Sequence, residues 1–570
     1  MKRFVALIAS AGIFLLILLI VSCRKTRTSE TAGEIPTGGT VVIALSSDPD
    51  MLNPLLGTGS NTGVVLQFLF PDLAEQEFDP ADGTLRFIPS LARSWEWKRD
   101  GLSLVYHLRT DAFWSDSIPI TAEDIKNSYA LYANSKVASP RRNYLNTLIK
   151  NKDGQVDLDR AIETPDDSTV VFNFETVYQQ DQQLLHTQLN FIPSHHFRMI
   201  PPEEVRTSEF NRMPVTAKHF SLAKWVPKQE MILEKNKSWN IPHTAYVDRI
   251  VFRVIPEMST RVVELRTGTV DIVEGLSPED AAIIEKNDPQ VRIETQSYRR
   301  FDYVGWSHID TETYRKSKRK TVRPHFIFGS RKIRTAITMA IRRDELVESW
   351  LGKFGQISTG PISPAFLWAY NDSVKPIPYD PAKAKSMLEQ EGWKDHDGDG
   401  ILDKDGKKFE FTITTNSGNP RRAFALQKIQ SDLKKIGIVC HSQLVESNVF
   451  NSGLKNKEYE AFVTGHNVNM TIDLVPQYGS DLERNTFNAV SYQSRQVDSL
   501  LALAASAADV RTAGPVYKTV HRIIYEDQPV TYLYWYDNIV GINNRVHGTH
   551  IDILSPYHRY YDWYISDSNR

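Results

Sequence analysis

Apolar residues recur with two different periods along this chain, which predicts a fold that mixes strands with helices. Residues 39–45 form a short apolar run typical of a strand. Residues 94–99 and 103–109 alternate apolar and polar side chains on either side of Asp100-Gly101, which is typical of a hairpin. Isoleucines four residues apart predict a helix over residues 330–342. Further helices are expected after Thr121, over 260–267, after Asp380, around 426–436, and over about 495–507 and 512–526.

Length and composition narrow the class of protein. With 570 residues the chain is too long for one small domain, so we expect several units or two large α/β lobes. Hydrophobic residues make up 41% of it, which is enough for a buried core and excludes general disorder. The chain has 67 basic and 69 acidic residues, so it carries no large positive net charge that would attract nucleic acid. Two cysteines, Cys23 and Cys440, exclude a disulfide scaffold.

The N-terminal residues have the pattern of an export signal. Lys2 and Arg3 precede 18 uncharged residues, 4–21, and the chain turns polar directly after Cys23. The stretch Ile20 to Cys23 resembles a bacterial lipobox. That resemblance implies a signal peptide over residues 1–22, acylation of Cys23, a flexible tether over 23–38, and a lipoprotein of the cell envelope facing the periplasm or the exterior. An uncleaved membrane anchor is the alternative, because the run is just long enough to span a bilayer.

Enzymatic signatures are missing from the sequence. It contains no G-x-S-x-G, H-E-x-x-H, C-x-x-C or phosphate-loop motif, so we expect no enzyme. The adjacent pair His195-His196 is interpreted as part of a surface turn and not as a metal site. Cys440 follows Ile438 and Val439 in an apolar setting, which favours a buried inert thiol.

A loop between Trp393 and a strand at 409–414 matches part of a calcium-binding pattern. Its first, third, fifth, seventh and ninth positions are Asp395, Asp397, Asp399, Ile401 and Asp403, with Gly400 at the sixth. The twelfth position, where a bidentate Glu closes the coordination shell, is Gly406. A solvated turn explains the same residues, so structural calcium and no cofactor both remain open.

Several stretches in a fixed order resemble the bacterial extracellular solute-binding proteins of the oligopeptide and dipeptide type (family 5), the receptors of ABC importers. The first run is Leu91 to Trp97, Asp100-Gly101, Tyr106 to Arg109, Trp114 to Asp116 and Thr121 to Asp124. Glu264 to Val273, Ile333 to Ile341 and Tyr379 to Trp393 are similar to later family elements. Each match is weak alone, and their order over about 480 residues makes the resemblance specific.

The resemblance implies a two-lobed, hinge-closing receptor of the type II periplasmic-binding-protein class, working as a monomer with ABC permease subunits. Residues 39–304 and 531–570 would form lobe I, with an extra subdomain at about 61–205, and residues 305–530 lobe II. The chain would cross between lobes near 303–307 and 529–536. The implied function is capture of a peptide or other polar solute in the interlobe cleft for delivery to a membrane permease.

The family's usual G-W-x-x-D motif is altered here, which leaves peptide specificity open. In that motif the aspartate pairs with the ligand's α-ammonium, but the matching residues are Gly465, His466 and Asn469. An amide cannot neutralise a buried ammonium. Asp473, four residues later, is the candidate replacement.

The candidate ligand-binding residues follow the expected hinge and the loop after the strand at 461–464. They are Trp306, His466, Asn467, Asn469 and Asp473, with Ser46, Asp48 and Asn53 as candidates on the opposing lobe. Two other functions remain open. One is an extracytoplasmic hydrolase on the same scaffold, and the other is a sensory or chaperone-like interaction module.

Overall fold

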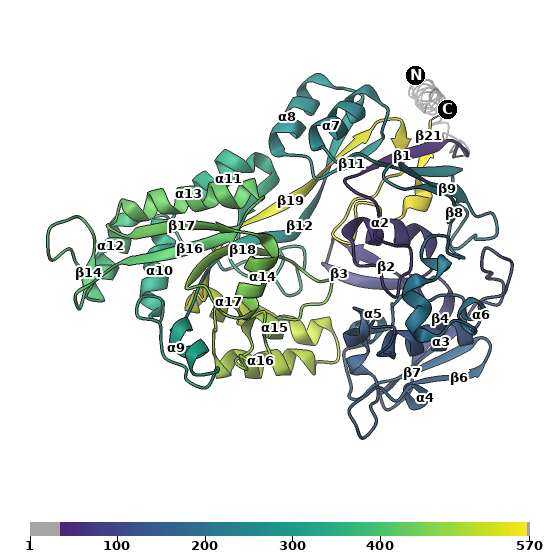
Figure 1. Ribbon diagram of the computed structural model, residues 1–570, viewed down its shortest axis with the longest axis horizontal. Helices are drawn as coiled ribbons and strands as arrows, with labels where there is room; N and C mark the ends of the chain where they lie inside the picture. The colour runs from purple at the N-terminus through teal and green to yellow at the C-terminus, as the bar shows by residue number, and fades with distance from the viewer. Residues whose placement is uncertain (1–34, 567–570) are drawn as a thin grey trace, which may run out of the picture.

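The computed structural model describes residues 35–566. The expected signal peptide over 1–22, the lipid-bearing Cys23 and most of the 23–38 tether lie outside the described residues. Figure 1 shows two masses side by side, with the purple and blue N-terminal half next to the green second half. No helix within residues 35–566 combines the length and the apolarity that a membrane span needs.

One sheet of eleven strands runs through both masses. Its strand order is β17-β16-β18-β12-β19-β11-β1-β10-β9-β8, and β13 pairs with β19 beside this path. The strands are β1 (Thr40–Leu45), β8 (Phe220–Val226), β9 (Glu230–Lys235), β10 (Arg249–Val254), β11 (Ile272–Glu274), β12 (Val291–Trp306), β13 (Gly355–Ile357), β16 (Glu410–Asn416), β17 (Val439–Val445), β18 (Ala461–Asn467) and β19 (Val530–Asn543). The first strand, expected over 39–45, is confirmed.

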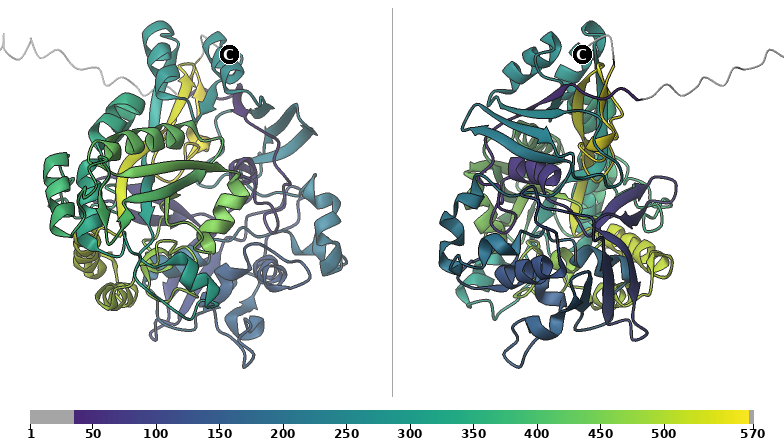
Figure 2. Two further views of the ribbon diagram at one scale, coloured as in Figure 1. Left: turned by 60° about the vertical axis from the view of Figure 1, so that its left-hand side comes forward. Right: turned by 90° about the vertical axis from the view of Figure 1, so that its right-hand side faces the viewer.

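The two longest strands, β12 and β19, join the lobes. They lie side by side, teal and yellow, in both views of Figure 2. Residues 291–296 of β12 pair with 538–543 of β19, and residues 300–305 pair with 530–536. The register shifts between Gln296 and Arg300, and β12 gains β18 as a second partner from Arg300 onward.

The change of neighbours therefore falls at residues 297–299 in β12 and at Asp537 in β19. Val291 and Ile539 belong to a core of the first lobe, whereas Phe301 and Trp535 belong to a core of the second. These positions precede the expected 304/305 boundary and follow the expected 530/531 boundary. The shift arises because both strands continue unbroken past the junction, so hydrophobic periodicity does not mark it.

The first lobe has one large core that includes the region expected as a subdomain. Residues 61–205 contain the hairpin β2–β3 and the sheet β4-β5-β7-β6, yet their apolar side chains join β1, β10 and the C-terminal aromatics in one cluster. Phe68, for example, packs on Tyr560 with ring centroids 4.1 Å apart. The elements are α2 (Ser60–Leu69), β2 (Ala74–Asp79), β3 (Thr84–Pro89), β4 (Ala92–Trp97), β5 (Ser103–Leu108), α3 (Ala122–Ala133), α4 (Leu158–Ala161), β6 (Ile162–Asp166), β7 (Thr169–Asn173), α5 (Gln180–His186), α6 (Ser194–Phe197), α7 (Met258–Thr267), α8 (Pro278–Asn287), β20 (Val546–His547) and β21 (Tyr564–Ile565).

In the second lobe the sheet separates two cores. Side chains from α10, α12 and α13 pack on one face, and those from α16, α17 and the 362–369 segment pack on the other. Tyr303 and Trp306 of β12 face opposite cores, as alternation along a strand requires. The elements are α9 (Thr311–Lys316), α10 (Arg331–Ala340), α11 (Arg343–Trp350), α12 (Pro381–Gln390), β14 (Asp403–Lys404), β15 (Lys407–Lys408), α13 (Pro420–Lys434), α14 (Ser447–Lys455), α15 (Val475–Tyr478), α16 (Arg495–Ala505) and α17 (Val510–Asp527).

The seven helices expected from local signals in the sequence correspond to α3, α7, α10, α12, α13, α16 and α17. Thr121 and Asp124 form the reciprocal capping box at the start of α3, and Asp380 accepts the backbone N–H of Lys383 at the start of α12. The expected hairpin, β4 and β5, is also confirmed. The expected burial of Cys440 is confirmed, and burial raises the pKa of its thiol to about 12, which favours an unreactive side chain.

Candidate ligand-binding cleft

The loop of residues 468–474 follows β18 and lies between the two lobes. β18 holds its start, because His466 pairs with Phe301 of β12 and the Val468 N–H donates to the Arg299 carbonyl at 2.9 Å. Farther along, the Tyr517 hydroxyl donates to the Ile472 carbonyl at 2.7 Å. The loop is thus held by the sheet and by α17. Val468, Met470, Ile472 and Leu474 pack on a core of the second lobe, which leaves Asn469, Thr471 and Asp473 to face a ligand.

A hollow with about 480 Å³ of empty space, part of it open to solvent, borders this loop. Its apolar wall comes from Phe301, Ile362, Phe366 and neighbouring residues of the second lobe. Four of the side chains expected in the cleft line the same hollow: His466, Asn467, Asn469 and Asp473. An apolar wall with a few converging polar groups is typical of small-molecule sites.

The opposite side of the loop faces the first lobe. A second hollow, of about 1320 Å³ including open solvent, lies between the loop and residues of η-helix 142–147 and α5. The lobes also touch directly: the Gln179 side chain donates to the Ala504 carbonyl at 2.7 Å, and Phe78 packs edge-on against Phe366. The loop therefore forms part of an interlobe cleft in a conformation where the lobes are in contact. The first-lobe residues of the hollow are Tyr144, Thr147, Tyr178, Gln182, Leu185 and His186.

His466 enters the hollow as a neutral imidazole. Burial, and secondarily the Arg422 guanidinium, lower the pKa of His466 to about 4. Its ring stacks on Tyr303, with centroids 5.7 Å apart, and Nε2 lies 3.4 Å from the Tyr303 hydroxyl. Near neutral pH this side chain can accept or donate a hydrogen bond but brings no charge.

Asp473 is the carboxylate of the hollow. Its Oδ1 accepts the Val475 N–H at 3.1 Å, and within residues 35–566 no lysine, arginine or histidine forms an ion pair with it. The side chain is solvent-exposed but stands in a concave wall, and the surrounding protein raises its pKa. The raised pKa means that the charged carboxylate is disfavoured there, and a cationic group of a ligand would stabilise it.

An ion-paired triad beneath the hollow was missed by sequence reasoning. The fully buried Asp302 carboxylate accepts from Arg421 Nε at 2.9 Å and from Arg422 Nε at 3.2 Å. Arg421 also stacks on Tyr536, 3.7 Å from the ring centroid. Since Asp302 lies opposite Gly465 across the β12–β18 pair, the triad fixes the strand that leads into the loop. The only sequence signal was the Arg421-Arg422 pair at the start of a helix.

Trp306 does not line the cleft. Its indole is fully buried, donates to Thr531 Oγ1 at 3.0 Å and packs on Phe328 and Phe411. The reason is strand parity, because Phe301 and Tyr303 point to the cleft side of β12 and Trp306 to the other. Trp306 is therefore a core residue of the second lobe, contrary to the expectation that it stacks on a ligand.

The three first-lobe candidates do not line the hollows around the loop either. Asn53 is completely buried, where it donates to Asn211 at 2.8 Å and accepts the Leu55 N–H. Asp48 accepts the Trp225 indole N–H at 3.2 Å, and Ser46 lies exposed. The stretch after β1 holds the first lobe together, and a contact with ligand would need another conformation.

The acidic loop at 395–403 is closed by contacts within the protein. Asp395 accepts the backbone N–H groups of Gly398 and Gly400 at 2.7 and 2.9 Å, while Asp403 pairs with His396 at 2.8 Å. The Lys408 ammonium pairs with Asp399 and lies 3.6 Å from Asp397. Oxygens of Asp395, Asp397 and Asp403 still come within 4.8 Å of one another. Ile401, the seventh position, donates its N–H to Asp399.

Comparison with known proteins places the chain among binding proteins. Oligopeptide-binding protein AppA of Bacillus subtilis is 26% identical over 560 residues, covering 96% of each chain. Heme-binding protein A of Haemophilus influenzae is 23% identical and covers 89% of each. The solved structure of B. subtilis AppA in complex with a nonapeptide superposes with a TM-score of 0.72 at 25% identity, over 94% of this chain and 100% of that one. Residues 86–481 match the model of the bacterial extracellular solute-binding proteins, family 5, and the chain belongs to that family.

Proposed function

We propose that this protein captures a peptide or another polar solute in the cleft around the 468–474 loop and delivers it to the permease of an ABC importer. The observation that carries the proposal is the convergence of His466, Asn467, Asn469 and Asp473 on one hollow of the second lobe. Asn469 and Asp473 also line the second hollow, which the first lobe closes from the other side. Membership of a solute-binding family and the likeness to an oligopeptide-binding protein support it.

The side chains of the cleft suit a ligand with amide groups and a cationic end. Asn467 and Asn469 can each donate and accept, which matches the alternating donors and acceptors of a peptide backbone. Asp473 would take the ammonium, because Asn469 stands where peptide-binding members of the family carry their aspartate. Phe301 and Phe366 would cover apolar side chains of the ligand.

The two strands that cross between the lobes would act as the hinge for closure. β12 and β19 pass between lobes at residues 297–299 and at Asp537, so a few backbone torsions there would move one lobe against the other. The contacts Gln179–Ala504 and Phe78–Phe366 would break on opening. A ligand favours the closed form only by its difference in affinity for the two forms, so residues from both walls are needed.

Attachment to a membrane through acylated Cys23 completes the proposal. A 23–38 tether would let the monomeric body move beside its permease. Metabolic labelling with a fatty acid tests this arrangement: the native chain should incorporate label, and Cys23→Ala should be unlabelled and released from membranes. Label in the Cys23→Ala chain would contradict it.

No cofactor is needed for this function, and calcium at the 395–403 loop is the alternative. Two observations favour the absence of calcium. Lys408 already pairs with carboxylates of the loop, and Gly406 stands at the twelfth position, where calcium loops carry a bidentate Glu. An extracytoplasmic hydrolase would instead use perturbed groups such as His466 and Asp473 as acid and base, and would turn its ligand over.

A thermal-shift screen against peptide, amine and sugar libraries is the first test. A ligand at about 100 times its Kd stabilises the folded state by about 2.7 kcal/mol. We expect a peptide or amine hit that is recovered intact, with a smaller radius of gyration on binding in small-angle scattering. Conversion of the hit would favour the hydrolase, and a shift without any change in scattering would contradict closure. A library that produces no hit at all would favour an interaction module.

A further inference from the structure

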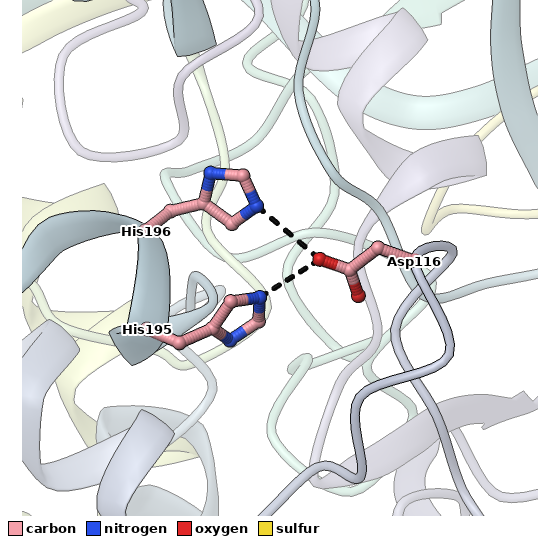
Figure 3. Close-up of side chains that lie close together, drawn as sticks. All are labelled: Asp116, His195 and His196. Atoms are coloured by element: carbon pink, nitrogen blue, oxygen red, sulfur yellow. Dashed lines mark hydrogen bonds and ion pairs between the residues drawn. The ribbon is translucent and has the colours of Figure 1, made fainter.

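A cluster of two histidines and one aspartate lies in the first lobe, far along the chain from the cleft residues. Figure 3 shows His195 and His196 pointing their ring nitrogens at the Asp116 carboxylate. The Nε2 atoms lie 2.8 Å and 3.2 Å from the same Asp116 Oδ2, and the three ligand-type atoms all fall within 4.8 Å of one another. We propose that this cluster binds one divalent transition-metal ion, with zinc as the best-suited probe.

The donor set determines the class of ion. Two imidazole nitrogens with one carboxylate oxygen suit zinc, copper or nickel, whereas calcium and magnesium prefer oxygen alone. Three protein ligands leave a coordination position open for water or another small ligand. The side chains of Asp116, His195 and His196 are 31%, 27% and 41% exposed, so an ion can reach them from solvent.

The two segments that carry the ligands are joined by a buried carboxylate. Asp124 of α3, only 2% exposed, accepts the Trp114 indole N–H at 3.1 Å and the Ser194 backbone N–H at 2.7 Å. Trp114 lies two residues before Asp116, and Ser194 begins the turn of helix with both histidines. The ligands are thereby held in place before any ion binds, which lowers the entropy that binding must overcome.

Asp116 is itself oriented by the backbone. Its other oxygen, Oδ1, accepts the Ile118 N–H at 3.3 Å, so Oδ2 is the oxygen that faces the histidines. Such outer contacts are typical of carboxylates that bind metals. The sequence alone favoured a plain surface turn for His195-His196, because it could not place Asp116, 79 residues earlier, beside them.

A second cluster, His550, Asp552 and His558, is less suitable. Both ring nitrogens of His558 are engaged, Nδ1 with Asp552 at 2.8 Å and Nε2 with the Gln76 carbonyl at 2.9 Å. His550 Nε2 lies 3.6 Å from Asp552 Oδ2, so the two imidazoles of this cluster converge on the carboxylate less closely than His195 and His196 do on Asp116. This cluster therefore serves as an internal control for the first.

The proposed site is separate from the ligand cleft. None of its three residues lines the hollows around the 468–474 loop, and Figure 1 shows α6 at the edge of the first lobe, on the side away from the second lobe. Zinc should therefore bind whether or not the cleft holds a solute. Its effect should be to clamp α6 to the 114–118 turn.

Isothermal titration of the purified protein, without an affinity tag, with zinc chloride tests the proposal. We expect one ion per chain, and His196→Gln or Asp116→Asn should weaken binding at least about 10-fold, the range seen when a group supporting a metal site is lost. Cobalt should give an absorption band in the parent that disappears in both variants. Affinity should fall in acid, since protons compete for the imidazoles.

The matched control is His550→Gln, which should bind zinc as the parent does. Melting curves without metal verify that each variant is folded. The proposal is overturned if the parent binds no zinc with a Kd below about 1 mM. It is equally overturned if His196→Gln and Asp116→Asn bind as tightly as the parent, or if binding is lost in His550→Gln instead.

Discussion

Replacing Asp302 with Asn tests the buried triad beneath the cleft. The carboxylate is completely buried and is the shared acceptor of Arg421 and Arg422, at 2.9 and 3.2 Å. Asparagine keeps the shape but removes the charge and one acceptor oxygen. Two guanidinium groups would then face each other without the anion that lies between them.

The expected cost follows from how far the partners are buried. Removing one member of a buried ion pair costs about 3–5 kcal/mol. Arg421 and Arg422 keep 19% and 15% of their side chains exposed, and Arg422 keeps a hydrogen bond to Asn416 at 2.9 Å. Because both charges stay partly compensated, we expect the lower end, about 3 kcal/mol. For a lobe of roughly 150–250 residues this lowers Tm by about 6–12 °C.

Differential scanning calorimetry at neutral pH measures that shift. The matched control is Asp372→Asn, an exposed carboxylate in the same lobe that should change stability by no more than about 0.5 kcal/mol. If Asp302→Asn melts within error of Asp372→Asn, the triad does not stabilise the lobe and the reasoning fails. A normal Tm together with lost ligand binding would instead make Asp302 part of the binding site.

The remaining predictions concern the loop, the core, acid stability and calcium. Asn469→Asp should tighten peptide binding about 10-fold, the difference between a neutral and a charge-assisted hydrogen bond, and an unchanged affinity by calorimetry would contradict our account of the loop. Trp306→Phe should lower the unfolding free energy by about 1–3 kcal/mol, through the lost bond to Thr531 and lost packing, without changing ligand affinity. If ligand affinity drops while the unfolding free energy stays the same, Trp306 contacts the ligand after all. Burial lowers the pKa of His521 to about 4, below the value of about 6.5 expected in the unfolded chain. The neutral, buried imidazole therefore contributes fully to the free energy of unfolding above pH 6.5, and this contribution falls by about 3 kcal/mol as the pH drops to 4. His521→Gln should flatten the acid limb of Tm against pH, and an identical limb would refute this. Calcium should leave Tm unchanged, whereas a rise abolished by Asp395→Asn would assign the 395–403 loop to calcium.

Part of the cleft could be predicted because a family resemblance located it in the chain. The motifs singled out the loop after β18, and the structure gathers His466, Asn467, Asn469 and Asp473 around one hollow. The same reasoning misassigned Trp306, although alternation along β12 was enough to separate it from Tyr303.

Local sequence by itself indicated part of the elements and several of their ends. Hydrophobic periodicity, the Thr121–Asp124 capping box and the Asp380-Pro381 start act over about one to four turns, so they are legible in a single stretch of chain. Tertiary structure alone decided which distant side chains meet. Asp302 lies about 120 residues from its arginines, and Asp116 about 80 from its histidines. Contacts at such separations depend on how sheets and helices pack, and no local period records that packing.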